Sequence, residues 1–178
     1  MVGLERGTVE LVSHRESWTR EFEAEATRLR AIVDNRLCEI EHVGSTAVEG
    51  LAAKPIVDMV GVVDSLDLAN ALIPALEAEG YTHRPNDEVD DRVFLAKGPE
   101  TDRTHYLSLT TRDSDTHREL TAFRDHLREN SDVAATYESV KRDLAARYPD
   151  DRAAYTREKS AFVESVTERA LLSEEPTD

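Results

Sequence analysis

Residues Glu41–Val60 read EHVGSTAVEGLAAKPIVDMV, and in this stretch a Gly-Ser pair, Gly44-Ser45, precedes a lone aspartate, Asp58. An apolar dipeptide lies on each side of Asp58, in a run that has the length of a buried strand. An ionised carboxylate is seldom buried without a partner. We therefore expect Asp58 to form an ion pair, to bind a metal ion, or to emerge at the end of a sheet.

The Gly-Ser pair follows a stretch in which apolar and polar residues alternate, and we expect it to begin a short helix. Glycine lets the backbone approach a ligand closely. The N–H groups at a helix start can bind an anion, and the hydroxyl of Ser45 can assist. The alternative is an ordinary turn with a serine N-cap. Asp58 favours the ligand site, because one short helix and one strand can place the turn beside its carboxylate, as a metal-bound nucleoside triphosphate requires.

The 178 residues suit a single domain, which we place at 1–172, followed by a frayed tail at 173–178. The formal net charge of −15 disfavours nucleic acids and anionic membranes as partners. Only four of the 22 basic residues are lysine. Abundant carboxylates with few lysines are typical of a halophilic protein, and an ordinary acidic protein is the alternative.

The sequence also bears on location and on cysteine chemistry. It has no apolar run of about 18 residues, the length that spans a membrane, and no basic segment followed by an apolar one, as in a signal peptide. We therefore expect a cytoplasmic protein. The single Cys38 excludes an internal disulfide and a cysteine-based zinc site.

Hydrophobic periodicity predicts an α+β fold with a mixed sheet, flanking helices and a helical C-terminal third. Ser13 and Glu16 have capping-box spacing at the start of a helix over 14–34. Asp64 is expected to cap a helix that Gly80 ends. Strands are predicted at 7–12, 37–43, 56–63, 89–96 and 104–111. Further helices are predicted at 114–129, 132–148 and 150–172.

The stretch HVGSTAVEGLAAKPIVDMV at 42–60 resembles the signature of the GrpB (UPF0157) family, H-I-G-S-T-A-V-P-G-L-A-A-K-P-I-I-D-I. The resemblance extends over nearly the whole chain, through SWTREFEAEATRLR at 17–30, RTHYLSL at 103–109 and the segment at 137–163. It implies a nucleotidyltransferase-like fold. Some members of the family are fused to dephospho-CoA kinase.

In the nucleotidyltransferase superfamily, Gly-Ser followed by Asp-x-Asp holds two Mg²⁺ ions and the triphosphate. The resemblance assigns Gly44 and Ser45 to the phosphates and Asp58 to Mg²⁺. Val60 stands at the position of the second aspartate, which members of the family generally lack. Two-metal catalysis needs bridging acidic ligands, whereas a single aspartate can hold one Mg²⁺ that also binds water and substrate phosphates.

Two histidines are accessory candidates. His42 either bonds a phosphate or orients Asp58, or it is a half-buried residue paired with a carboxylate. The family strand H-H-L-H is here His105-Tyr106-Leu107-Ser108, which disfavours a histidine-rich metal site. For His105 we therefore expect a hydrogen-bonded structural role.

The few lysines are informative because a salt-adapted surface avoids this residue. Lys54 lies in the central motif, and Lys141 and Lys159 each follow a tyrosine by four residues, on the same helix face. Lys159 also falls within an apolar stripe, so we expect it to line the phosphate or Asp58 site. The alternative for Lys141 and Lys159 is a structural pair with a carboxylate. Lys97 lies in a turn-rich connector, and we expect it to be solvated.

Two arginines alternate with apolar residues in or beside predicted strands. Arg92 either faces a phosphate pocket or forms a surface ion pair. For Arg103 the surface ion pair is the expected outcome.

Two functions remain open. The first is Mg²⁺-dependent transfer of a nucleotidyl group to a small acceptor, with Lys159 and Arg92 offsetting the phosphate charge. The second is a non-catalytic module that binds a nucleotide or a CoA-related phosphate, which Val60 favours. A second carboxylate facing Asp58, supplied by Glu41 or by the cluster at 87–91, would favour the enzyme. In both cases the expected partner is a nucleotide or another phosphorylated small molecule.

Overall fold

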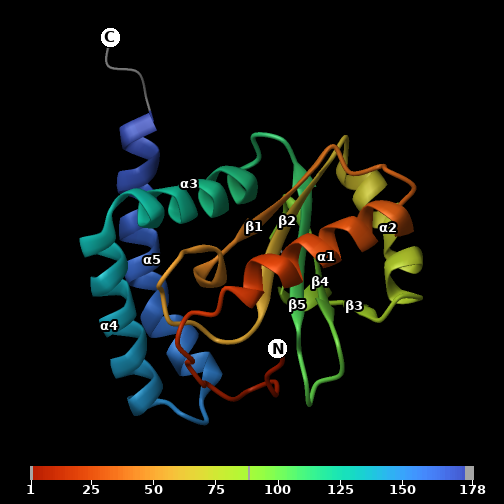
Figure 1. Ribbon diagram of the computed structural model, residues 1–178. Helices are drawn as coiled ribbons and strands as arrows, with labels where there is room; N and C mark the ends of the chain where they lie inside the picture. The colour runs from red at the N-terminus through yellow and green to blue at the C-terminus, as the bar shows by residue number, and fades with distance from the viewer. Residues whose placement is uncertain (1, 88, 175–178) are drawn as a thin grey trace.

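The computed structural model describes residues 2–87 and 89–174 (Figure 1). Its helices are α1 (Ser17–Ile32), α2 (Leu66–Glu77), α3 (Asp115–Glu129), α4 (Ser131–Arg147) and α5 (Arg152–Glu174). Its strands are β1 (Glu39–Val43), β2 (Val57–Val63), β3 (Tyr81–His83), β4 (Arg92–Lys97) and β5 (His105–Thr111). Two short 3₁₀ helices are η1 (Ser45–Ala47) and η2 (Pro85–Asp87).

The five strands form one mixed sheet in the order β1-β2-β5-β4-β3. β2 pairs in parallel with β5, and the neighbouring pairs β1–β2, β5–β4 and β4–β3 are antiparallel. β2 and β5 are interior strands, and nearly all of their residues are buried. Burial on both faces explains why β2 reads as a nearly continuous apolar run, whereas β5 also buries polar side chains such as Ser108 and Thr110.

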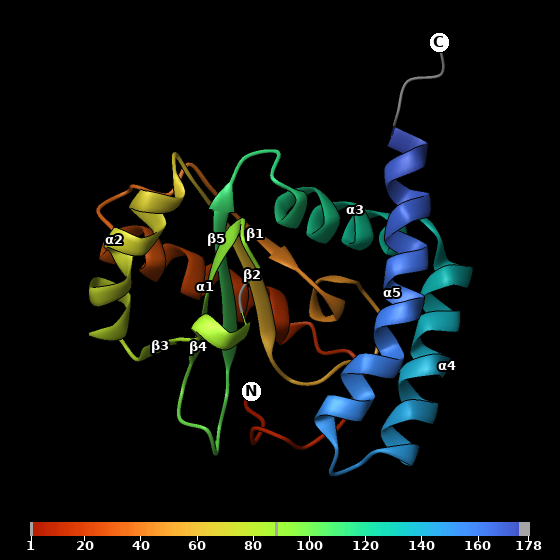
Figure 2. The same ribbon diagram turned by 180° about the vertical axis from the view of Figure 1, so that it is seen from behind.

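The two faces of the sheet have different partners. Val57, Met59 and Val63 of β2 belong to the main hydrophobic cluster, which also contains residues of α1 and α2. Since side chains alternate along a strand, Asp58 points to the opposite face. The helices α3, α4 and α5 gather on one side of the molecule (Figures 1 and 2), and α3 contacts β1, β2 and β5. The face that carries Asp58 is therefore bordered by the C-terminal third.

A second hydrophobic cluster fixes the loop that follows Gly44 against these helices. Val48 and Leu51, each 3% exposed, pack against residues of α3, α4 and α5 in this cluster. Burial of one such side chain contributes about 2 kcal/mol. The loop between β1 and β2 is thus held between the sheet and the C-terminal helices.

The N-terminal region differs from two predictions. Residues 7–12 form no strand, because their only ladder contact is an isolated bridge between Val12 and Ala53. Val9 instead packs with Leu144 and Tyr155 of the C-terminal helices. The first helix begins at Ser17 rather than at 14, and the predicted capping box is absent: the N-cap residue, Glu16, has αR geometry without a side-chain cap.

Three further boundaries were misplaced or missed. Ser65, rather than Asp64, caps α2, and its Oγ accepts a hydrogen bond of 3.1 Å from the backbone N–H of Leu68. β3 was not predicted, since three residues carry too little pattern. α5 continues through residues 173 and 174, and the rest of the predicted tail, 175–178, lies outside the described residues.

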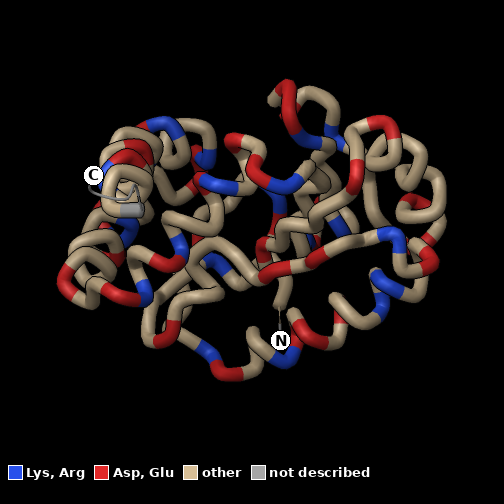
Figure 3. The backbone as a smooth tube through the Cα atoms, turned by 90° about the horizontal axis from the view of Figure 1, so that it is seen from above, with Lys and Arg blue, Asp and Glu red and all other residues tan. Residues whose placement is uncertain are grey.

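Acidic positions are spread over the whole backbone, with basic ones interspersed (Figure 3). No helix among the described residues has both the length and the apolar character needed to cross a membrane.

Candidate functional site

Gly44 and Asp58 lie side by side where β1 ends. Val43, the last residue of β1, pairs with Asp58 of β2. Gly44 has φ 72° and ψ −172°, a combination that is essentially restricted to glycine. The turn continues into η1, which has only three residues. The short helix predicted after Gly44 is therefore present, although three residues offer few free N–H groups to an anion. Any anion site here must rest on side chains.

A cavity of about 380 Å³ opens in front of these residues, within the range typical of small-molecule sites. It lies between the sheet, the turn at Gly44 and the C-terminal helices. Asp58 is the only carboxylate among its described lining residues. Its cationic lining residues are Lys54, Arg92, Lys141, Arg152 and Lys159.

Lys141 connects α4 to the turn. Its Nζ donates a hydrogen bond of 3.1 Å to Oγ of Ser45 and another to the carbonyl oxygen of Ala52. The same nitrogen lies 4.6 Å from the ring centroid of Tyr137. The side chain is 2% exposed, and burial, followed by the charge of Lys159, lowers its pKa to about 7. Lys141 thus holds Ser45 in place and adds a cation that is easily neutralised.

Lys54 and Lys159 share the ring of Tyr155, with their Nζ atoms 5.7 Å and 5.6 Å from its centroid. Burial is the main cause that lowers the pKa of Lys54 to about 7, followed by the charges of Lys159 and Arg152, and Asp58 opposes the shift. Two ammonium groups therefore approach one carboxylate from different parts of the chain.

The pKa of Lys159 moves in the opposite direction. Tyr137 is the largest cause that raises it, with further contributions from Tyr155 and Asp58, while burial opposes the rise. Lys159 therefore remains charged at neutral pH, even though neighbouring cations repel it.

Asp58 is densely surrounded by protein but remains partly exposed to the cavity. Burial raises its pKa, and the charges of Lys54, Lys159 and Arg152 oppose that rise. Among the described lining residues of the cavity, these cations share a single carboxylate.

The two arginines also lie over aromatic rings. The guanidinium carbon of Arg92 lies 4.9 Å from the ring centroid of Phe94, and that of Arg152 lies 5.5 Å from that of Tyr106. Arg92 also donates a hydrogen bond of 2.9 Å to the carbonyl oxygen of Asp87. Of the two outcomes considered for Arg92, the structure shows it lining the cavity.

Arg152 was not predicted as a site residue, although the sequence held a signal. It begins α5 and precedes Lys159 by seven residues, two helical turns, so both lie on one helix face. Ser108 was missed as well, because only the register of β2 with β5, which pairs it with Val60, brings it into the cavity wall.

The two histidines lie outside the cavity. Nε2 of His42 lies 2.8 Å from Oγ1 of Thr46, and its ring stacks on Phe22. Burial lowers the pKa of His42 to about 4, so it is neutral at pH 7 and supports the turn from behind. His105 faces the opposite side of the sheet from Asp58, with Nδ1 2.9 Å from Oγ1 of Thr104. A structural role fits both residues.

Two other basic residues are also remote from the cavity. Arg103 forms the expected ion pair, with Glu100 at 3.9 Å, but its own side chain is buried and also donates to the carbonyl oxygen of Gly98. The expectation that Lys97 is solvated was wrong, because its Nζ lies 2.5 Å from Oε2 of Glu25. Glu25 is buried and also accepts a hydrogen bond of 2.7 Å from the hydroxyl of Tyr81.

Of the two candidate sources of a second carboxylate, Glu41 and Asp91 of the cluster at 87–91 are engaged elsewhere, and residue 88 of that cluster lies outside the described residues. Glu41 pairs with Nη1 of Arg124 at 2.7 Å and lies 3.3 Å from Nε2 of His117. Asp91 accepts hydrogen bonds from the N–H of Thr116 at 2.8 Å and from its hydroxyl at 2.6 Å. Neither carboxylate lines the cavity in the part of the chain that the structure describes.

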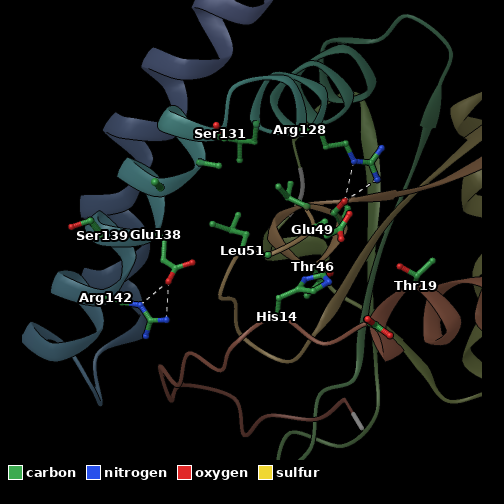
Figure 4. Close-up of a pocket in the computed structure, with 17 residues that line it drawn as sticks. His14, Thr19, Thr46, Glu49, Leu51, Arg128, Ser131, Glu138, Ser139 and Arg142 are labelled. Atoms are coloured by element: carbon green, nitrogen blue, oxygen red, sulfur yellow. Dashed lines mark hydrogen bonds and ion pairs between the residues drawn. The ribbon is translucent and has the colours of Figure 1, made fainter.

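A second, larger cavity of about 960 Å³ lies on the other side of the same loop (Figure 4). Arg128 reaches over it to the carbonyl oxygen of Ala47, at 2.8 Å from Nη2. On α4, Glu138 accepts a hydrogen bond of 2.8 Å from the N–H of Ala52 and pairs with Arg142. The charged side chains of Arg128 and Glu138 in this second cavity thus hold the loop between β1 and β2 in place.

Comparison with known proteins defines the class and then the family. Terminal uridylyl transferase 4 from Trypanosoma brucei, solved with bound dUTP, matches 90% of this chain and 55% of its own with a TM-score of 0.56 and 14% identity. This likeness shows a nucleotidyltransferase-like fold, and the chain spans about half of that protein.

The GrpB protein family model matches residues 8–169. The glutamate-rich protein GrpB of Alkalihalophilus pseudofirmus is 36% identical over 93% of this chain and 98% of its own length. The crystal structure of GrpB from Enterococcus faecalis matches 92% of this chain and 98% of its own with a TM-score of 0.85 and 33% identity. The chain belongs to the GrpB family.

Proposed function

We propose that the cavity at Asp58 binds the phosphate groups of a small phosphorylated molecule. One observation carries this proposal: five cationic side chains and one carboxylate line the described part of the cavity. The excess is unusual in a chain with a net charge of −15. Lysine and arginine side chains form strong, charge-assisted hydrogen bonds with phosphate oxygens.

The electrostatics of the site support the proposal. Burial and neighbouring cations lower the pKa of both Lys54 and Lys141 to about 7. Placing several positive charges close together costs free energy, because each repels the others. A polyanion in the cavity offsets this repulsion, so its binding stabilises the charged lysines and the fold together.

The described part of the cavity offers one carboxylate, that of Asp58, to the Mg²⁺ ions that nucleotidyltransferases use. Asp58 can serve as a protein ligand to one Mg²⁺, which would complete its shell with water and phosphate oxygens. A second ion lacks a bridging carboxylate, since Val60 stands beside Asp58 and no other described carboxylate lines the cavity. The residues therefore fit one Mg²⁺, which would supply further positive charge at the phosphates, and they do not fit a two-metal centre.

Nucleotidyl transfer to a small acceptor is the second candidate. The observation in its favour is the placement of Gly44, Ser45 and Asp58 around one cavity, in a fold that resembles a terminal uridylyl transferase. In this case Asp58 would hold Mg²⁺, and Lys159 and Arg92 would stabilise charge on the phosphates. The missing second carboxylate makes binding without transfer the better-supported function.

A thermal-shift panel tests the proposal. The panel contains ATP, UTP, CoA and dephospho-CoA, each with and without Mg²⁺, and adenosine and pantetheine as controls without phosphate. A ligand at 100 times its Kd stabilises the native state by about 2.7 kcal/mol. We expect at least one phosphorylated ligand to raise the melting temperature, with no effect of the controls. Pyrophosphate release from ATP or UTP with Mg²⁺ and a panel of small hydroxyl and amine acceptors distinguishes transfer from binding. Equal responses to the phosphorylated ligands and the controls would contradict the proposal.

A further inference from the structure

Four of the five aromatic side chains that line the described cavity are buried, and the fifth, Phe94, is partly buried. Tyr155 is 1% exposed, Tyr137 is 2% exposed, and Tyr106 and Phe123 are each 8% exposed. Proteins that bind nucleotides through their bases commonly stack the base on an aromatic face. That face must be open to the cavity, and these four rings are almost completely covered by protein atoms. The ring of Phe94 is engaged as well, because the guanidinium carbon of Arg92 lies 4.9 Å from its centroid and the centroid of Tyr106 lies 5.5 Å away.

The ring faces are occupied by the cations of the site. Lys141 lies over Tyr137, both Lys54 and Lys159 lie over Tyr155, and Arg152 lies over Tyr106. Such cation–π contacts within about 6 Å of a ring centroid are attractive. The aromatic residues therefore hold the cations at the cavity wall.

Tyr137 illustrates how completely the rings are engaged. Its ring stacks on Phe162, with centroids 5.4 Å apart and planes at 6°, and meets the edge of Phe123 at 89°. With Lys141 also 4.6 Å from its centroid, the ring has no face left for a base.

The polar side chains that line the cavity also argue against recognition of a base. Base edges are read by Asn, Gln, Asp and Glu, as well as by Arg and Lys. The Arg and Lys side chains of this cavity all lie over aromatic rings. No Asn or Gln side chain lines the described cavity, and its one carboxylate, Asp58, lies among cations. The lining thus offers dense positive charge and hydroxyl groups, such as those of Ser45 and Ser108, which suit phosphate oxygens.

We propose that this cavity recognises a chain of phosphates and is indifferent to the base attached to it, so that inorganic tripolyphosphate belongs to its ligand class together with nucleoside triphosphates of any base. The inference rests on the proposed phosphate-binding function. Among the described lining residues, cationic side chains outnumber carboxylates by five to one. A tripolyphosphate group carries several negative charges in a small volume, which matches this excess.

Isothermal titration of the wild-type protein with tripolyphosphate, ATP, GTP, CTP and UTP tests the inference, in the presence and in the absence of Mg²⁺. We expect the five dissociation constants to agree within about threefold, less than 1 kcal/mol. If one nucleotide binds more than about tenfold tighter than tripolyphosphate, the base is recognised and the inference fails while the proposed function holds. If none of the five binds, the proposed function itself fails.

A variant provides an independent check of the same site. Arg152→Gln is expected to weaken binding of tripolyphosphate and of all four nucleotides by one common factor, because it removes charge from the phosphate site. Arg142→Gln removes the same charge beside the other cavity, from a side chain that is 51% exposed, and should leave all five affinities unchanged. A loss that depends on the base would overturn the inference.

Discussion

A Cβ atom placed on Gly44 would lie 2.7 Å from Oδ2 of Asp58. The two residues are fourteen positions apart in the chain and meet because β1 ends beside the second residue of β2. The missing side chain at position 44 is what gives the carboxylate room next to the turn.

Replacement of Gly44 by alanine is therefore expected to destabilise the protein and to remove phosphate binding. Two effects add: the backbone conformation at φ 72° strains any side chain, and the new methyl group overlaps Asp58. Gly50→Ala is the matched control, because φ is 79° there and a Cβ would meet nothing within 4 Å. In urea denaturation we expect Gly50→Ala to cost about 1–2 kcal/mol and Gly44→Ala to cost more. Equal costs would show that the contact with Asp58 is unimportant.

The lowered pKa of Lys141 predicts that the free energy of unfolding depends on pH. Its pKa in the folded protein is about 7, below its ordinary value of 10.5. Between these values the unfolded chain binds the extra proton, so stability rises with pH, with a limiting slope of about 1.4 kcal/mol per pH unit. Lys141→Met removes this contribution. Urea denaturation from about pH 7 to pH 10 should therefore show the wild type gaining stability relative to the variant. Parallel pH profiles would refute the assigned burial of the charge.

Val60 stands where the superfamily has its second aspartate, but here it is 0% exposed and does not line the cavity. Val60→Asp should therefore destabilise the fold, by at least about 2 kcal/mol for a buried polar group without a partner, and should not produce an efficient nucleotidyltransferase. Val60→Thr, which changes polarity without adding charge, should cost less. A folded Val60→Asp variant that releases pyrophosphate faster than the wild type would contradict this view of the site.

The acidic composition predicts stability that depends on salt. With a net charge of −15, repulsion among carboxylates should destabilise the fold at low ionic strength, and salt screens it. The melting temperature should rise substantially from about 0.1 to 3 M KCl, beyond the range in which simple screening saturates. A flat profile would indicate an ordinary acidic protein rather than a salt-adapted one.

The sequence predicted most of the sheet because its strands have strong patterns. β2 is a nearly continuous apolar run, and the register between β1 and β2 brings Gly44 next to Asp58, as the central motif suggested. The false strand at 7–12 has the right residues, but its apolar side chains pack on helices instead of pairing in a ladder. Local pattern cannot distinguish these two uses of an extended segment.

A residue of the cavity could be predicted from the sequence where a charged side chain stood among apolar ones. Lys159 stood out in an apolar stripe, and it lines the cavity. Arg152 did not stand out, because it lies at the start of a helix among polar neighbours. Lys97 was misread because its partner, Glu25, is 72 positions away, and a long-range ion pair leaves no local pattern.

The central claim is that the cations around Asp58 bind phosphate. It is tested most directly by isothermal titration of ATP into the wild type, Lys159→Gln and Arg142→Gln at constant ionic strength. Lys159 lies over Tyr155 in the cavity, whereas Arg142 pairs with Glu138 beside the other one. We predict that the wild type and Arg142→Gln bind ATP equally and that Lys159→Gln binds about tenfold more weakly or worse, a loss of at least about 1.4 kcal/mol. Unchanged affinity in Lys159→Gln, or no binding by the wild type, would contradict the claim.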